Sequence, residues 1–250
     1  MNLSNKKIVI TGGTSGIGFG LAKKFLDKGN EVLAVGFNQE NIERALKEEP
    51  RLKVLNADLS KAEARINFVR ELEDKFSEYN VIINNAGIQR QFSLMNADRD
   101  WDFYKAELAI NFEAPLHLTL LMLNHLVKQK EAAIINVSSG LVINPGAWVP
   151  FYTSAKNGLH GFTEVLRLQL QDTPVYVAEI FPPAVDTGLG NTGDHSYGAT
   201  VEDFVSSVVL QLEESRPYIV FGSSKTQFEA TKEENRKQTL TNWEHFKDKL

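Results

Sequence analysis

The sequence contains no cysteine, which excludes disulfide bonds and thiolate metal centres. It also has no uninterrupted apolar run near the ~20 residues that a membrane-spanning helix needs. The segment from Met1 to Lys7 lacks the long apolar region of a secretory signal. These absences favour a cytoplasmic protein that has no membrane partner.

Basic residues are in the minority, since 27 lysines and arginines face 32 aspartates and glutamates, a formal net charge of -5. Such a chain has no general attraction to nucleic acid, and it has no basic run interleaved with aromatic residues. Nucleic acid is therefore not an expected partner. No metal is expected either, because the histidines lack the spacing of metal ligands: His117, His125, His160, His195 and His245.

A length of 250 residues with 42% hydrophobic composition suits one domain over residues 1–250. Short β-branched runs alternate with longer amphipathic stretches, which predicts an α/β fold with a doubly wound parallel sheet of about seven strands in three αβα layers. The runs are 8–10, 32–35, 52–55, 81–83, 134–137, 175–180 and 218–221. Helices are expected from about Ile17, Glu40, Lys61, Arg99, Tyr152 and Val201, with a bend or break at Pro115.

The final segment, residues 225–250, is polar and charged but carries apolar residues at helical spacing: Leu240, Trp243, Phe246 and Leu250. This pattern predicts a C-terminal amphipathic helix. Its apolar stripe packs either on its own subunit or on a partner subunit, and the sequence leaves both alternatives open.

A glycine turn follows the first apolar run, with Gly12, Gly16 and Gly18 standing between that run and a helical pattern. Glycines allow a tight turn, and the free amides at a helix start can receive a pyrophosphate. The spacing is wider than Gly-x-Gly-x-x-Gly, and an ordinary turn is the alternative. The position in the first βα unit favours a nucleotide site.

Tyr152 and Lys156 are four residues apart, and Ser139 lies thirteen residues before the tyrosine. On a helix, that spacing places phenol and ammonium on one face. A nearby ammonium stabilises a phenolate, so we expect Lys156 and an oxidised nicotinamide cation together to lower the pKa of Tyr152 by ~2 to 3 units from its reference near 10. The tyrosine would then exchange a proton with a substrate oxygen, to which Ser139 gives a second hydrogen bond. A solvated pair on a helix surface is the alternative.

These residues together resemble the short-chain dehydrogenase/reductase family. The matches, in chain order, are Thr11, Gly12, Gly16 and Gly18 to its glycine motif, Asn84 to Gly87 to its Asn-Asn-Ala-Gly, and Asn111, Ser139, Tyr152 and Lys156 to its catalytic residues. The stretches around Ile88 to Arg90 and from Pro182 to Gly190 look like those of the DltE-type oxidoreductases, a bacterial branch.

The resemblance implies a Rossmann-type fold and an NAD(P)-dependent enzyme that interconverts a carbonyl and an alcohol. Its catalytic residues would be Asn111, Ser139, Tyr152 and Lys156, with Asn111 linking Lys156 to a proton path through water. It also implies a homodimer or homotetramer. The implied cofactor-binding residues are Gly12, Thr14, Ser15, Gly16, Ile17, Gly18, Asn38, Asp58, Leu59, Asn85, Ala86, Gly87, Tyr152, Lys156, Pro182, Val185 and Thr187.

The choice between NADP and NAD rests on the end of the second strand. An NAD site places an acid there, and this chain has Gly36. The basic residues of many NADP-binding relatives are also missing, because Phe37 and Ser15 stand in their places. Asn38 can bind either a phosphate or a hydroxyl. We expect NADP ahead of NAD.

Substrate contacts are expected from Gln89 to Gln91, Leu141, Ile143, Trp148 and the loop 188–198, which includes His195. This mixture of apolar and amide groups suits a moderately apolar ketone or alcohol. A cofactor-binding regulatory or sensor protein on the same fold is the second hypothesis. The complete catalytic set disfavours it, because a binding module does not need all four residues. An enoyl reductase would space its tyrosine and lysine further apart.

Overall fold

The computed structural model describes residues 3–189 and 198–249. Its centre is one sheet of seven parallel strands in the order β3-β2-β1-β4-β5-β6-β7. Every predicted strand is present, as β1 (Lys7–Thr11), β2 (Glu31–Gly36), β3 (Lys53–Asn56), β4 (Val81–Asn84), β5 (Ala132–Val137), β6 (Val175–Phe181) and β7 (Tyr218–Val220). The predicted α/β architecture is confirmed.

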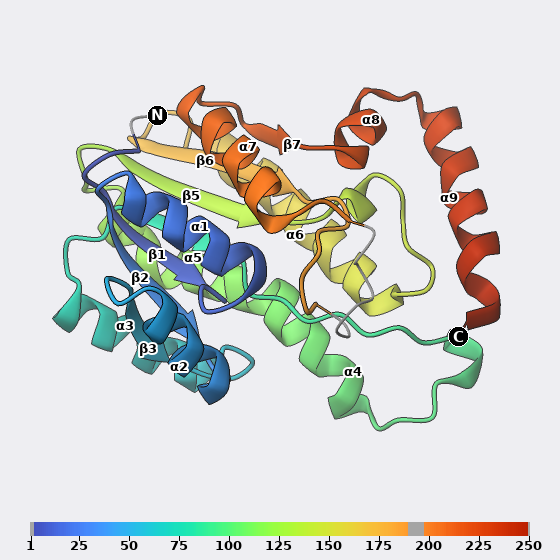
Figure 1. Cartoon of the computed structure of the whole chain (residues 1–250), viewed down its shortest axis with the longest axis horizontal. Coiled ribbons are helices and arrows are strands. Elements are labelled where there is room, and N and C mark those ends of the chain that lie inside the picture. Colours follow the sequence, from blue (N-terminus) through green and yellow to red (C-terminus); the bar gives the residue numbers. More distant parts are fainter. Residues whose placement is uncertain (1–2, 190–197, 250) are drawn as a thin grey trace.

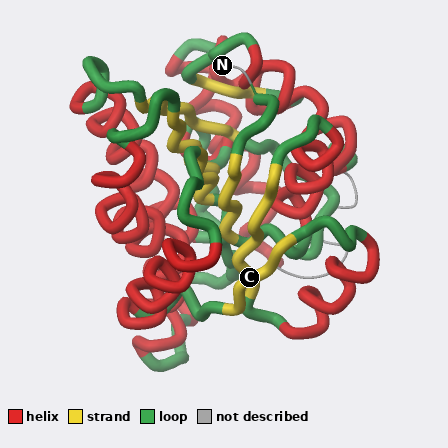
Figure 2. The backbone as a smooth tube through the Cα atoms, turned by 90° about the vertical axis from the view of Figure 1, so that its left-hand side faces the viewer, coloured by secondary structure: helices red, strands yellow, loops and turns green. Residues whose placement is uncertain are grey.

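Helices cover both faces of the sheet, so that the strands lie between two helical layers (Figure 2). Successive side chains of a strand point to opposite faces, and β1 shows the consequence. Ile8 and Ile10 pack with helices α1 (Gly16–Asp27) and α7 (Val201–Glu213). Val9 packs in the opposite core with α3 (Ala62–Lys75) and α5 (Ala114–Leu126). This double burial is why the strands are continuous apolar runs.

The bend or break predicted at Pro115 takes the form of a change of helix type just before it. Helix α4 (Trp101–Leu108) runs into a π-helical turn at Ala109–Glu113, and α5 then starts at Ala114 with Pro115 in its first turn. Proline is tolerated there because its missing N–H is not needed for an intrahelical bond within α5. The π-helical turn, which the sequence pattern did not predict, contains the buried Asn111. Such turns are frequently found at functional sites.

The C-terminal segment differs from the single helix expected over 225–250. It forms α8 (Ser223–Glu229) and α9 (Lys232–Phe246), followed by a short 3-10 turn, Lys247–Lys249. The helix is interrupted between α8 and α9 because Thr231 and Glu234 form a reciprocal capping box that starts a new helix. No described side chain of α9 is buried, and Leu240 is 58% exposed. Leu250 lies outside the described residues.

The remaining helices are α2 (Gln39–Glu48) and α6 (Pro150–Gln169), with 3-10 turns at Leu94–Asn96 and Gly140–Val142. None of the described helices combines the length and the apolar character that a membrane crossing requires. The predicted functional residues follow the carboxyl ends of strands, where parallel sheets bind ligands. Gly12 follows β1, Asn85 follows β4, Ser139 follows β5 and Pro182 follows β6.

Candidate active site

A cavity of about 940 Å³ opens at this edge of the sheet. Of the residues predicted from the sequence, those that line it are Gly12, Ser15, Gly16, Ile17, Asn85, Ala86, Gly87, Ser139, Tyr152, Lys156, Pro182, Val185 and Thr187. Those outside its lining are Thr14, Gly18, Asn38, Asp58, Leu59 and Asn111. Leu59 and Asn111 line a smaller pocket directly behind, together with Lys156.

The glycine turn is fastened to the segment after β4. Thr11 Oγ1 accepts hydrogen bonds from the backbone amides of Asn85 (2.9 Å) and Ala86 (3.0 Å), and Asn85 Nδ2 donates to the Thr11 carbonyl at 2.9 Å. A Cβ on Gly18 would lie 2.4 Å from Asn85 Nδ2, so only glycine permits this approach. Gly12 adopts a φ of +66°, which also favours glycine. Contacts with the segment after β4 therefore fix the conformation of the glycine turn.

The amino end of α1 faces this cavity and suits an anion. Ser15 makes no capping hydrogen bond with its side chain, and the first turn carries no acidic residue. Amides at a helix start that have no capping side chain are available to a phosphate, and the helix dipole favours its charge. Thr187 lies beside Gly16, within 3.4 Å of where a Cβ would stand. The residues present fit the pyrophosphate of a dinucleotide.

Ser139, Tyr152 and Lys156 come together on one wall of the cavity. All three are buried, with 7%, 6% and 3% of their surfaces exposed. Lys156 Nζ lies 5.6 Å from the centre of the Tyr152 ring and donates to the Val137 carbonyl at 2.8 Å. The two residues share one face of α6, as their spacing predicted.

The pKa of Tyr152 does not behave as predicted. Burial raises it to about 12, a hydrogen bond with Ser139 lowers it in part, and the charge of Glu107 raises it. The expected lowering, which depends on Lys156 together with a nicotinamide cation, is absent from the chain by itself, because burial weighs more and Lys156 donates to a backbone carbonyl. Burial also lowers the pKa of Lys156, to about 8, against the charge of Glu179. Both shifts favour the uncharged forms of Tyr152 and Lys156, because burial removes the water that would stabilise a charge.

Asn111 binds the backbone of the segment after β4, close to Lys156. Its Oδ1 accepts from the Ile88 amide at 3.0 Å, and its Nδ2 donates to the Ile88 carbonyl at 2.8 Å. A Cβ on Gly87 would lie 2.9 Å from Asn111 Oδ1 and 3.7 Å from Lys156 Nζ. The asparagine and the ammonium therefore both lie close to Gly87, where a side chain would approach each of them.

Two acidic residues near the catalytic set were missed from the sequence. Glu107 is fully buried, and its Oε1 accepts from the Arg90 amide at 3.0 Å. Burial raises its pKa to about 7. Glu107 stands four residues before Asn111, and this spacing was the only available signal. It places a second polar group on the same helical segment as the predicted asparagine.

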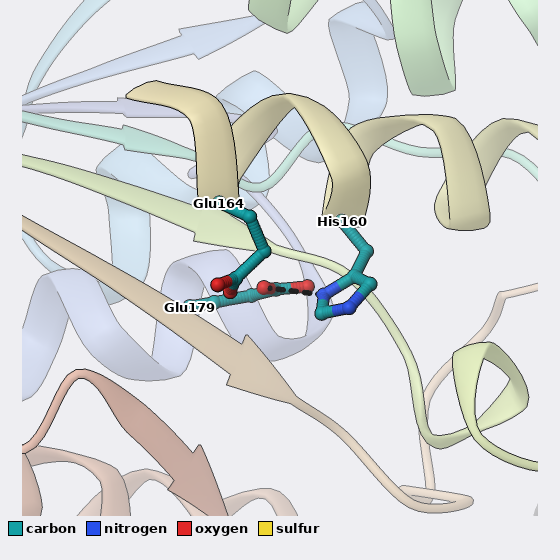
Figure 3. Close-up of side chains that lie close together, drawn as sticks. All are labelled: His160, Glu164 and Glu179. Atoms are coloured by element: carbon teal, nitrogen blue, oxygen red, sulfur yellow. Dashed lines mark hydrogen bonds and ion pairs between the residues drawn. The ribbon is translucent and has the colours of Figure 1, made fainter. Parts of the chain in front are cut away.

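Glu179 is the other missed acid, and Figure 3 shows it between His160 and Glu164. Glu179 is fully buried, and its Oε2 pairs with His160 Nδ1 at 2.9 Å, which raises the pKa of the histidine. The ligand atoms of the three residues lie within 4.8 Å of one another. Glu164, however, accepts from Arg167 at 2.7 Å and from Tyr218 at 2.9 Å. Both carboxylates therefore have partners within the protein, although Glu179 Oε1 has no hydrogen-bond partner among the described residues.

The predicted substrate contacts divide into two groups. Gln89, Gln91, Leu141 and Trp148 line the cavity, as do Gly188 and Leu189, whereas Arg90 and Ile143 do not. Residues 190–197, with His195, lie outside the described residues. Three lining residues come from the C-terminal segment and were not predicted: Ser223, Gln227 and Phe246.

At the other end of the cavity, near α1 and α2, Gly36 stands where an NAD site places an acid. Thr14 Oγ1 lies 2.8 Å from the position of a Cβ on Gly36, and Phe37 is 65% exposed. Asn38 Oδ1 accepts from the Asn41 amide at 2.9 Å, so this oxygen caps α2. Basic side chains missed from the sequence line the wall here, Lys23 and Arg44.

Fold and site together define a class, the NAD(P)-dependent oxidoreductases. A parallel sheet presents a dinucleotide site, and a buried serine, tyrosine and lysine stand beside it.

Comparisons with known proteins identify the family. Its model, "short chain dehydrogenase", matches residues 6–197. The chain is 37% identical over 211 residues to "Uncharacterized oxidoreductase DltE" of Bacillus subtilis (strain 168), with 84% of each chain covered. It is 30% identical over 226 residues to D-beta-hydroxybutyrate dehydrogenase of Cupriavidus necator, covering 87% of this chain and 86% of that protein. The chain belongs to the short-chain dehydrogenase family, and its resemblance to the DltE type is confirmed.

Solved structures agree on the fold. A short-chain dehydrogenase/reductase from Burkholderia phymatum in complex with NAD superimposes with a TM-score of 0.79 at 18% identity, covering 88% of this chain and 89% of that one.

Proposed function

We propose that the protein interconverts a carbonyl compound and the corresponding alcohol by hydride transfer, with Tyr152 as acid and base. The observation that carries this proposal is the convergence of Ser139, Tyr152 and Lys156 on the cavity into which the glycine turn opens. A bound nicotinamide supplies or accepts the hydride at the substrate carbon. Every other part of the reaction falls to side chains of this chain.

In the reducing direction, the Tyr152 hydroxyl gives its proton to the substrate oxygen as the carbon–oxygen double bond is lost. Ser139 holds the same oxygen with a second hydrogen bond. A phenol whose pKa is raised to about 12 is fully protonated at neutral pH, as an acid must be. Lys156, held by the Val137 carbonyl, would stabilise the phenolate that forms, and Asn111, like Lys156, lies close to Gly87. A proton from solvent then restores the phenol.

The direct test is Tyr152→Phe, which removes only the hydroxyl. We expect turnover of simple ketones and alcohols to fall by a factor on the order of 10² to 10⁴, while cofactor affinity stays within about twofold. Tyr176→Phe, which removes a hydroxyl bonded to the Arg216 carbonyl far from the cavity lining, serves as the matched control. Retained activity in Tyr152→Phe would refute the assignment, and cofactor binding without turnover in the native protein would favour a sensor.

For the cofactor, NADP remains our choice over NAD. Gly36 offers no carboxylate to a ribose hydroxyl, and Lys23 and Arg44 line the same end of the cavity. A 2′-phosphate could bind the Arg44 guanidinium, which donates at 2.8 Å to a neutral partner, the side-chain oxygen of Asn41. Arg44→Ala should weaken NADPH about tenfold and leave NADH unchanged, with Arg70→Ala on α3 as control. Tighter NADH than NADPH binding in the native protein would overturn the choice.

For assembly, we propose a homodimer or homotetramer that pairs through α5 and α6. Large apolar side chains are exposed on these helices, namely Leu120 at 66%, Val165 at 52% and Leu168 at 69%. Exposed apolar side chains gathered on neighbouring helices are typical of a contact with another subunit. The mass in solution of a Leu168→Glu variant tests this, because a charge there should release monomers.

A further inference from the structure

The far end of the cavity has an aromatic wall. Trp148, in the segment before α6, stacks on Phe246 at the end of α9, with ring centres 4.1 Å apart and planes 18° apart. With Val149 and Tyr152, they belong to an apolar cluster separate from the two cores of the sheet. The stacked pair therefore packs beside the catalytic phenol, and both rings line the cavity.

Helix α9 contributes little to the hydrophobic core. It lies along the outer edge of the molecule (Figure 1), and none of its described side chains is buried. Its amino end is tied to α8 by a hydrogen bond from Asn235 Nδ2 to the Gln227 carbonyl at 2.9 Å, and Gln227 also lines the cavity. A helix that contributes almost nothing to the core delivers one aromatic ring to the active-site wall.

Charge is distributed unevenly along the cavity. Apart from Lys156, the charged residues among the described lining are Lys23, Arg44, Asp186 and Glu202. These surround the glycine turn, since Lys23 and Arg44 stand on α1 and α2, Glu202 pairs with Lys24 of α1, and Asp186 precedes Thr187, which lies beside Gly16. The described lining near the aromatic pair is uncharged: Gln89, Gln91, Leu141, Leu189, Ser223 and Gln227.

Apart from Lys156 beside the reacting oxygen, the described lining at this end offers no cation to a substrate carboxylate, whose loss of hydration would be costly. A flat apolar ring would instead stack on the aromatic wall, and aromatic contacts add to the ordinary gain from burial. The three glutamine amides can bond to uncharged polar substituents. The chemistry of this end therefore selects for an uncharged molecule with a ring next to its reacting carbon.

We propose that the substrate is an uncharged aryl ketone or the corresponding benzylic alcohol, whose ring packs on Trp148 and Phe246 while its oxygen meets Ser139 and Tyr152. The proposal rests on the proposed function. In reduction, hydride from the nicotinamide forms the new carbon–hydrogen bond, the carbonyl double bond breaks, and Tyr152 protonates the oxygen. The nicotinamide is oxidised as the ketone is reduced.

The test compares acetophenone, butanone and acetoacetate as substrates of the native protein and Phe246→Ala. The native enzyme should use acetophenone at least about tenfold better than acetoacetate, in kcat/KM. Phe246→Ala should lose about tenfold on acetophenone, mainly through KM, and little on butanone, which is too small to reach the wall. Leu240→Ala, an exposed residue of the same helix, is the matched control. Phe246→Leu, which keeps an apolar side chain, checks that any loss comes from the ring.

An equal loss on acetophenone and butanone in Phe246→Ala would overturn the proposal, as would preferred turnover of acetoacetate. If the native protein reduces no ketone, the proposed function fails, and calorimetry of acetophenone with the NADP-loaded protein still tests the wall. Binding that Phe246→Ala weakens would support the aromatic site, whereas no binding to the native protein would refute it.

Discussion

The two ends of the cavity are built in opposite ways. At the nucleotide end, backbone and short side chains of β1, its glycine turn and the segment after β4 hold one another through Thr11 and Asn85. At the substrate end, side chains from four distant parts of the chain meet, and one of them, Phe246, arrives on a helix without buried residues. Hydrogen bonds between segments of the sheet fix the nucleotide end, whereas the shape of the substrate end depends on side chains from segments outside the sheet. One scaffold can therefore keep its cofactor and change its substrate.

The largest effect on cofactor affinity should come from Gly18→Ala, which disturbs the nucleotide end. The added methyl would lie 2.4 Å from Asn85 Nδ2 and from the Gly12 carbonyl, so the turn must move. We expect cofactor affinity to fall by about 100-fold, since a phosphate site depends on backbone placement. Fluorescence titration measures it.

Gly161→Ala is the matched control for that substitution. Gly161 lies inside α6, and a Cβ there would meet nothing within 4 Å. The variant should be more stable by about 0.5 to 1 kcal/mol and bind cofactor normally. Equal cofactor affinity in the two alanine variants would show that the nucleotide end is not rigid.

Thr11→Val probes the fastening between β1 and β4. It keeps the shape but removes the oxygen that accepts two backbone amides, which are then left unpaired. The unfolding free energy should fall by roughly 1 to 3 kcal/mol in denaturant titration, with weaker cofactor binding. If stability and affinity are unchanged, these hydrogen bonds do not hold the turn.

Glu107 gives a smaller, pH-dependent effect beside the substrate end. Burial raises its pKa from the ordinary 4.5 to about 7 in the folded state. Between these values the native state binds more protons than the unfolded state, so the unfolding free energy should fall as pH rises from about 5 to 7. Glu107→Gln should flatten this part of the curve. An unchanged slope, matching that of the exposed control Glu71→Gln, would contradict the buried-acid account.

Most of the fold was predictable because each strand is a short β-branched run with turn residues after it. The break at Thr231 could also have been found, since Thr231 and Glu234 have capping-box spacing. The π-helical turn was not predictable, because it depends on how Asn111 reaches the Ile88 backbone.

The residues of the site also fall into two groups, those that the sequence predicted and those that it did not. Motifs placed the glycine turn, Ser139, Tyr152 and Lys156 correctly on its wall, because their contacts follow from local spacing and strand order. Phe246 and Glu107 were missed, because their contacts join segments far apart in the chain. The raised pKa of Tyr152 in the chain by itself was not predicted either, because burial depends on the whole fold.

Isotope transfer tests the central claim most directly. Native protein is incubated with acetophenone and NADPH carrying deuterium at the hydride-donating carbon, and the alcohol is analysed by mass spectrometry and NMR. Butanone serves as a parallel substrate, so that the outcome does not depend on the aromatic wall. Deuterium should appear on the carbinol carbon with the native protein, and Tyr152→Phe should form the labelled alcohol more slowly by a factor on the order of 10² to 10⁴. Unlabelled alcohol from the native protein, or equal labelling by the variant, would contradict hydride transfer assisted by Tyr152.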